Sequence, residues 1–141
     1  MIARLLLAAV FLLAGALKFP DPLGFADGIA GFGLVPVWMI VPLALGIPIF
    51  EILTGAALLS TRFRSAGALA ASGLSLAFVL LYAWAWAWGL DVQCSCFGSL
   101  EIFKVSNGAG LLRGLVLLLL STWVYAEAGF IEPRRARTKE E

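Results

Sequence analysis

The stretch "AGALAASGLSLAFVLLYAWAWAWGL", residues 66–90, decides the fold class because it contains no charged residue. A helix that crosses the hydrocarbon core of a bilayer needs about 20 mostly apolar residues. The rest of the chain has the same character, since 62% of all residues are hydrophobic and only 13% are charged. Soluble globular domains carry about 25% charged residues. The sequence therefore predicts an all-α membrane protein.

Other stretches are also apolar enough to span a membrane, and together they predict a four-transmembrane-helix bundle. The predicted spans are residues 2–18, 37–59, 66–90 and 110–127. Residues 19–36, "FPDPLGFADGIAGFGLVP", contain too much glycine and proline to cross, so we expect an interfacial segment between the first two spans. Residues 1–132 then form one membrane domain, and residues 133–141 form a charged, disordered cytoplasmic tail.

The first span also has features of a signal peptide. Arg4 precedes an apolar run, and Ala14, Gly15 and Ala16 fit a cleavage site made of small residues. We expect this segment to be retained as the first helix of the bundle.

The positions of the basic residues predict the orientation, because cytoplasmic loops are enriched in lysine and arginine. With four spans, one side of the membrane receives Arg4, Arg62, Arg64, Arg134, Arg135, Arg137 and Lys139. We therefore expect a protein of a bacterial-type cytoplasmic membrane with both termini in the cytoplasm. The loop between the last two spans then faces the periplasm or the cell exterior, where disulfides persist.

Composition excludes several functional classes. The chain has no histidine, which removes the commonest general base and the usual ligand of haem and zinc. Its net charge is only +1, and the basic residues form no extended patch beyond the short tail. We therefore expect no nucleic acid among its partners.

Glu51 lies inside the second predicted span, where a carboxylate costs about 3 kcal/mol unless it is paired or protonated. We expect it to face the bundle interior, with Arg113, Lys18 or a neighbouring hydroxyl as its partner. Two roles stay open at this point. Glu51 is either a proton acceptor or ligand-binding group, or a structural carboxylate.

Polar side chains recur along residues 66–90 at helical spacing, and they comprise Ser72, Ser75, Tyr82 and Trp86. This face either lines a cavity for a membrane-soluble molecule or forms hydrogen bonds between helices. Trp84 and Trp88 share a face near the end of the same span, at the depth of the aromatic belt of a membrane interface.

Both cysteines of the chain stand before the last span, as Cys94 and Cys96 with one residue between them. A disulfide across so small a ring is strained and easily reduced, which is typical of catalytic or regulatory pairs. Two thiolates can also hold a soft ion, Cu(I) or Hg(II), but without histidine they cannot complete a structural zinc site. A weakly stabilising structural disulfide and two unrelated thiols are the other interpretations. Arg113 either neutralises a nearby thiolate or contacts lipid phosphate.

Three motifs together resemble the MauE branch of the DoxX-like integral membrane proteins: "LLAGALKFPDP" (12–22), "IPIFEILTGAALL" (47–59) and "CSCFG" (94–98). The resemblance, over residues 1–126, implies a four-helix membrane protein linked to thiol–disulfide metabolism. MauE itself is associated with maturation of the disulfide-rich small subunit of methylamine dehydrogenase, and other DoxX-like proteins with thiosulfate oxidation or membrane redox complexes. The residues that match the family are Lys18, Glu51, Cys94, Cys96, Gly98 and Arg113. Gly114 stands where the family pattern has asparagine, so a polar partner for Arg113 is missing.

The leading hypothesis is a membrane thiol–disulfide oxidoreductase component whose catalytic pair is Cys94 and Cys96. The pair would exchange electrons with a periplasmic or extracellular thioredoxin-like or disulfide-containing protein. A membrane quinone is a candidate cofactor, in a pocket formed by Glu51, Tyr82, Trp86 and Arg113. One alternative is a protein that binds or transports Cu(I) or Hg(II) through the same two thiolates. Another is a non-catalytic assembly or scaffold subunit of a membrane redox complex. Membrane lipid is a partner in each case.

Overall fold

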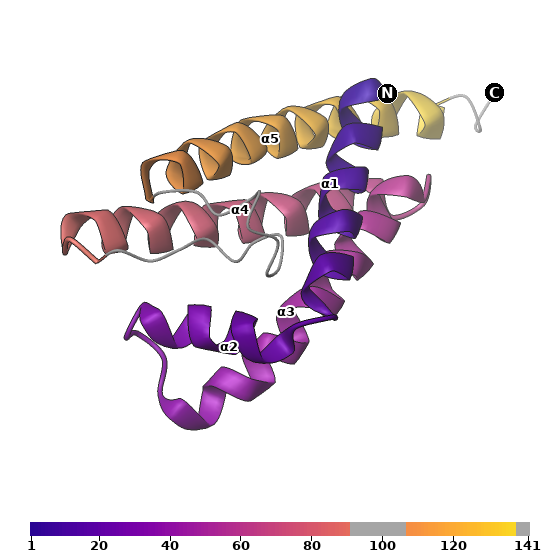
Figure 1. Ribbon diagram of the computed structural model, residues 1–141. Coiled ribbons are helices and arrows are strands. Elements are labelled where there is room, and N and C mark those ends of the chain that lie inside the picture. The colour runs from indigo at the N-terminus through magenta and orange to yellow at the C-terminus, as the bar shows by residue number, and fades with distance from the viewer. Residues whose placement is uncertain (91–106, 138–141) are drawn as a thin grey trace.

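The regular secondary structure of the described residues is helical, as Figure 1 shows. The computed structural model describes residues 1–90 and 107–137. In chain order the helices are α1 (Ile2–Lys18), α2 (Pro22–Gly31), α3 (Val37–Leu59), α4 (Arg64–Ala87) and α5 (Asn107–Arg137). No strand occurs in this part of the chain, so the prediction of an all-α protein is confirmed for the described residues.

Three helical segments are long and apolar enough to cross a membrane: α3, α4 and the part of α5 from Gly108 to Ala128. Helices α1 and α2 pass the same test together, but the chain bends by 102° between them. The described residues thus provide three candidate spans, or four if the bent pair forms one span. The predicted count of four is compatible with this result and stays a prediction.

The helix bounds follow the predicted spans closely in the first half of the chain and less closely in the second. Helices α1 and α3 have the bounds expected from the sequence, whereas α4 begins earlier, at Arg64. Helix α5 continues to Arg137 and so extends into residues 133–141, which we expected to form a disordered tail. The limit of the membrane domain at residue 132 stays a prediction.

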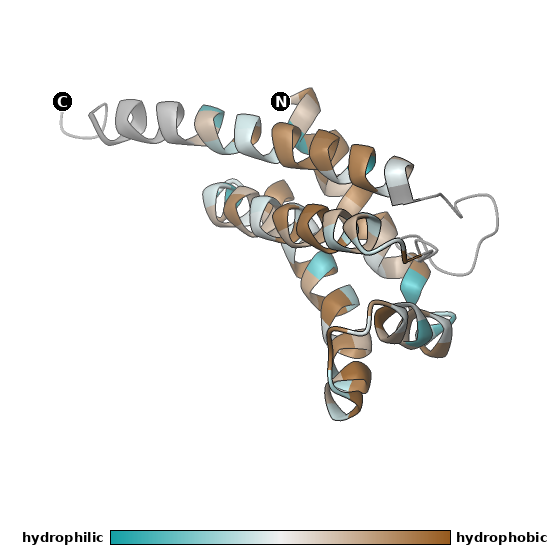
Figure 2. Ribbon diagram, turned by 90° about the vertical axis from the view of Figure 1, so that its left-hand side faces the viewer, coloured by the Kyte–Doolittle hydropathy of each residue, from teal (hydrophilic) through white to brown (hydrophobic). Residues whose placement is uncertain are grey.

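The helices carry large apolar side chains on their outer surfaces. Leu53 of α3, Leu80 of α4 and Leu119 of α5 are all exposed. Figure 2 shows apolar residues along these helices. A helix of a soluble protein buries its apolar stripe and exposes polar residues. The exposed apolar faces are those that lipid would cover, which agrees with a membrane location.

Two prolines and an aspartate set the bend between α1 and α2. Pro20 and Pro22 lack the N–H group that would continue α1. Asp21 begins the next helix, because its Oδ1 accepts a hydrogen bond from the Gly24 N–H at 2.9 Å while Pro22 takes the first helical position. The segment predicted to be interfacial is therefore a short helix that packs on α3 through Phe25. Its location at the membrane interface stays a prediction.

The helices pack as two close pairs, α1 with α3 and α4 with α5 (Figure 1). Glycines allow α1 and α3 to approach closely. A Cβ atom at Gly15 would lie 2.8 Å from the Pro48 carbonyl oxygen, and one at Gly55 would lie 2.7 Å from Leu12 Cγ. Helix α3 also contacts α4 and so joins the two pairs. The buried core between them contains Leu7, Ala8, Phe11, Leu58, Ala68, Ala71 and Val124.

Charged residues from separate helices gather at the end of the molecule where α1 begins. A cavity there is lined by Met1, Arg4, Arg64 and Glu127, which brings together the starts of α1 and α4 and the later part of α5. The end of α4 and the start of α5 lie at the opposite end (Figure 1). The molecule therefore has one end that contains Arg4 and Arg64 and another at which α4 ends and α5 begins.

Candidate functional site

A buried ion pair joins α1 to α3. Lys18 Nζ lies 2.6 Å from Glu51 Oε2, and the two residues are only 1% and 2% exposed. Lys18 Nζ also donates a hydrogen bond to the Ala14 carbonyl oxygen at 3.3 Å and lies 5.2 Å from the centre of the Phe25 ring. The ammonium group therefore contacts a carboxylate, a backbone carbonyl and an aromatic face within the protein interior.

Local structure explains how the pair forms. Lys18 is the last residue of α1, where a cation interacts favourably with the carbonyl end of the helix. Glu51 lies on the face of α3 that meets α1 at Gly15. Thr54 is buried on the same face of α3, but its hydroxyl donates to the Phe50 carbonyl oxygen at 2.8 Å. Of the partners that the sequence left open for Glu51, the structure places Lys18 in direct contact.

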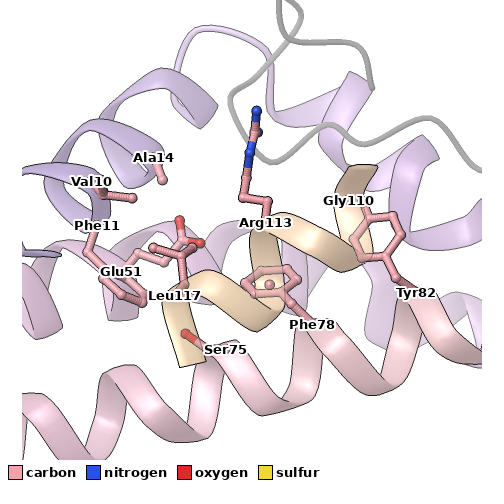
Figure 3. Close-up of a pocket in the computed structure, with 11 residues that line it drawn as sticks. Val10, Phe11, Ala14, Glu51, Ser75, Phe78, Tyr82, Gly110, Arg113 and Leu117 are labelled. Carbon is pink, nitrogen blue, oxygen red and sulfur yellow. The ribbon is translucent and has the colours of Figure 1, made fainter. Parts of the chain in front are cut away.

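A small cavity of about 40 Å³ lies beside the ion pair, where α1, α3, α4 and α5 meet (Figure 3). Its polar lining residues are Glu51, Ser75, Tyr82 and Arg113. The structure thus places three of the four residues predicted to form a pocket around one cavity. The fourth, Trp86, does not line it.

Ser75 brings an unsatisfied hydroxyl to this cavity. The residue is 1% exposed, and its Oγ has no hydrogen-bond partner among the described residues. Ser72, one turn earlier on α4, instead donates to the Ala68 carbonyl oxygen at 2.9 Å. A buried polar group without a partner costs about 1–3 kcal/mol. The cavity therefore contains a group that a bound polar molecule could satisfy.

Trp86 departs from the polar face predicted for α4. It is 66% exposed, whereas Tyr82 is 3% exposed. Four residues turn a helix by about 400°, so Trp86 is rotated by about 40° from Tyr82 and lies one turn further along the axis. That displacement carries it past the cavity to the outer surface. Trp84 and Trp88 share a face as predicted, with their ring centres 5.3 Å apart.

Several residues of the cavity were not recognised from the sequence, and Phe78 and Gly110 are two of them. Phe78 lies three residues after Ser75 and four before Tyr82, so helical spacing alone was a sufficient signal. Gly110 of α5 lies against the Tyr82 ring, since a Cβ atom there would be 2.9 Å from Tyr82 Cε1. That contact depends on the packing of two helices and has no local signal.

The predicted catalytic residues Cys94 and Cys96 lie outside the described residues, as does Gly98. Their roles in redox chemistry or in metal binding stay predictions. Within residues 1–90 and 107–137, no group of three or more His, Cys, Asp or Glu side chains is placed to hold a metal ion.

Comparison with protein families identifies what the chain is similar to. The family model described as "Methylamine utilisation protein MauE" matches residues 1–127. No curated protein and no solved structure matches the chain. The match confirms the resemblance to MauE inferred from the three motifs. The matched range includes Lys18, Glu51, Cys94, Cys96 and Arg113.

Proposed function

We propose a redox function for this chain, which belongs to the MauE family because that family's model matches residues 1–127. Family membership and the apolar helices together indicate a multi-pass membrane protein. The family is described by its association with methylamine utilisation. The finer proposal is that this member is a four-span, DoxX-like component of a membrane thiol–disulfide system.

The observation that carries the proposal is the spacing of Cys94 and Cys96, the two cysteines of the chain. A disulfide between cysteines separated by one residue stabilises the folded state only weakly, because closing so short a loop removes little entropy from the unfolded chain. A strained disulfide is instead easy to reduce, which suits repeated oxidation and reduction.

The proposed reaction is exchange with a thioredoxin-like protein. One thiolate of the pair attacks a disulfide of the partner and forms a mixed disulfide, which releases one partner thiolate. The second thiolate of the pair then attacks the mixed disulfide and releases the other partner sulfur. The pair loses two electrons and two protons, and the partner disulfide gains them as two thiols. The same steps run in reverse when the partner is the more reducing protein.

The arrangement of charge supports an extracytoplasmic location for the pair. Arg4 and Arg64 line one end of the molecule, and basic residues favour the cytoplasmic side of a membrane. The end of α4 and the start of α5, between which residues 91–106 stand in the sequence, lie at the other end. In a bacterial cytoplasmic membrane crossed four times, the cysteines would face an oxidising compartment, where disulfides form and persist.

Thiol trapping in whole cells tests this function. We expect Cys94→Ser and Cys96→Ser each to stop oxidation or reduction of partner thiols, because a single thiol cannot complete the exchange. The variant that keeps the attacking cysteine should also accumulate a mixed disulfide that is visible on a non-reducing gel, and the variant that lacks it should form none. The matched variant Ser95→Ala should behave as the wild type. Wild-type turnover of partner thiols in both cysteine variants would refute the proposal.

A further inference from the structure

A cavity of about 170 Å³ lies at the end of the molecule where α1 and α4 begin, and it takes no part in the thiol chemistry proposed above. Arg4 of α1, Arg64 of α4 and Glu127 of α5 line it, together with the buried apolar residues Val124 and Ala128. Within the described part of the chain, the lining thus holds two guanidinium groups and one carboxylate.

The two arginines of this cavity lack an anionic partner within the part of the chain that the structure describes. No ion pair to Arg4 or Arg64 occurs in residues 1–90 and 107–137, although Glu127 lines the same cavity. The Nε atom of Arg4 is buried and has no hydrogen-bond acceptor there either. A buried donor without an acceptor is costly, so an anion in the cavity would stabilise this arrangement.

The backbone favours an anion at the same place. Helices α1 and α4 both begin at this end, and neither has a side chain that caps its first N–H groups. The N-terminal end of a helix carries a partial positive charge, which attracts anions. The planar guanidinium group of arginine also matches the geometry of phosphate oxygens, to which it can donate two parallel hydrogen bonds.

The position of the cavity along the helices places it at the depth of lipid headgroups. The apolar segment of α4 begins at Arg64, and that of α5 ends at Ala128. In a membrane protein, the headgroup region begins where the apolar spans end. Trp123 is 66% exposed and lies one helical turn before Glu127, and exposed tryptophan is typical of this interface. The phosphates of the bilayer therefore lie close to the cavity.

We propose that this cavity binds the phosphate group of an anionic phospholipid, such as phosphatidylglycerol, whose acyl chains stay in the bilayer beside the helices. Arg4 and Arg64 donate hydrogen bonds to the phosphate oxygens. A cavity of about 150 Å³ accepts a benzene ring, and a phosphate group is smaller than that ring, so the volume is sufficient. Basic pockets between membrane helices bind anionic headgroups in this way.

Other phosphate compounds fit less well. The ammonium group of a zwitterionic headgroup would add a third cation beside the two arginines, with Glu127 as the one carboxylate among the described lining residues. Free inorganic phosphate has the same oxygens but no acyl chains to hold it at the interface. The proposed site goes beyond the redox function and does not depend on it, because neither cysteine is needed for lipid binding.

Native mass spectrometry of the delipidated full-length protein in detergent micelles tests the site. The probes are dioleoylphosphatidylglycerol, dioleoylphosphatidylethanolamine and dioleoylglycerol, which has no phosphate. We expect one phosphatidylglycerol to bind tightly, phosphatidylethanolamine to bind about tenfold more weakly, and dioleoylglycerol not to bind at this site. Arg4→Gln and Arg64→Gln should each weaken phosphatidylglycerol binding about fivefold, because one cation beside the phosphate is lost.

The matched control is Arg62→Gln, which removes the same charge from the same end of the molecule. Arg62 is exposed in the turn between α3 and α4, and its guanidinium lies 5.9 Å from the centre of the Phe63 ring. It does not line the cavity, so its loss should leave the affinity unchanged. Circular dichroism shows whether each variant is folded.

A second variant should bind the lipid more tightly than the wild type. Glu127 is exposed and lines the cavity, so Glu127→Gln removes a negative charge close to the phosphate. We expect the affinity for phosphatidylglycerol to rise about twofold, as is typical of an exposed charge. A purely structural role of the two arginines would not produce this gain.

The possible results lead to separate conclusions. Equal losses of affinity in Arg62→Gln and Arg4→Gln would indicate general attraction to surface charge and would overturn the site. Weaker phosphatidylglycerol binding in Glu127→Gln would overturn an anionic headgroup as the ligand. Displacement of the lipid by millimolar inorganic phosphate would overturn phospholipid as the source of the phosphate. The Cys94→Ser/Cys96→Ser double variant should bind the lipid as the wild type does, so failure of the redox function would leave the site standing.

Discussion

At the scale of single residues, Lys18 and Glu51 determine how the first two helices meet the third. Removing two charges from water costs several kcal/mol for each ion, and direct contact offsets this cost only when the geometry is good. The pair lies where the chain bends by 102° between α1 and α2. The contact therefore holds the bend against the middle of α3, and Glu51 also lines the cavity of about 40 Å³ beside the pair.

Breaking the pair on one side should destabilise the protein strongly. We expect Lys18→Met to lower the free energy of unfolding by about 3–5 kcal/mol, because Glu51 is left buried without its partner. The double variant Lys18→Met/Glu51→Met should recover most of this loss, since no charge stays buried. Unfolding in mixed micelles with increasing sodium dodecyl sulfate, followed by circular dichroism, measures both. Equal losses in the single and double variants would show that the pair is not coupled.

At the scale of helices, glycines determine which helices come close together. Gly15 and Gly55 lie on the facing sides of α1 and α3, and Gly67 lets α4 begin against the end of α3, since a Cβ atom there would lie 2.8 Å from Leu58 N. Small residues are the usual means of close packing between membrane helices, where no hydrophobic force drives association. The ion pair and the cavity beside it both depend on this approach.

A methyl group at one of these contacts should separate α1 from α3. A Cβ atom at Gly15 would lie 2.7 Å from Ile52 Cγ1 and 2.8 Å from the Pro48 carbonyl oxygen, and the backbone oxygen cannot easily move away. We expect Gly15→Ala to lower the free energy of unfolding by about 1–3 kcal/mol, as overpacking does.

The matched control for this change is Gly46→Ala on α3, where a Cβ atom would meet nothing within 4 Å. It should be neutral or stabilise the helix by up to about 1 kcal/mol, because alanine is the better helix former. The same unfolding titration compares the two variants. A larger loss for Gly46→Ala than for Gly15→Ala would contradict the packing argument.

At the scale of the whole molecule, two helix pairs and one bent connection define two ends. The basic end is made by residues distant in sequence, since Arg4 and Arg64 line the same cavity. The proposed function requires this end to be cytoplasmic and residues 91–106 to lie on the other side. The orientation of the helices in the membrane therefore decides whether the cysteines face the compartment in which disulfides form and persist.

Single cysteines placed in a Cys94→Ser/Cys96→Ser background should report the orientation. Phe63 is exposed in the turn between α3 and α4, and Leu34 is exposed between α2 and α3. A membrane-impermeant maleimide added to intact cells should label Leu34→Cys and spare Phe63→Cys, which should react only after the cells are broken. The opposite pattern would reverse the orientation, and labelling of both in intact cells would contradict a four-span arrangement.

The sequence by itself determined the fold class, the bounds of α1 and α3 and the family. The physical reason is that the length of an apolar run, the positions of prolines and the positions of basic residues act locally and do not depend on packing. The motifs around Lys18, Glu51 and the cysteines were likewise readable without a structure. The helical period also placed Ser75 and Tyr82 on a common face.

Only the tertiary structure decided which residues meet. It paired Glu51 with Lys18, a residue 33 positions away in the chain, brought Arg113 to the same cavity and left Trp86 outside it. It also placed Phe78 and Tyr82 in the walls of this cavity and of a second cavity between α2, α3 and α4. Such contacts depend on how each helix is rotated and crossed against its neighbours. The period of one helix describes its own faces, but not which face of another helix will pack against them.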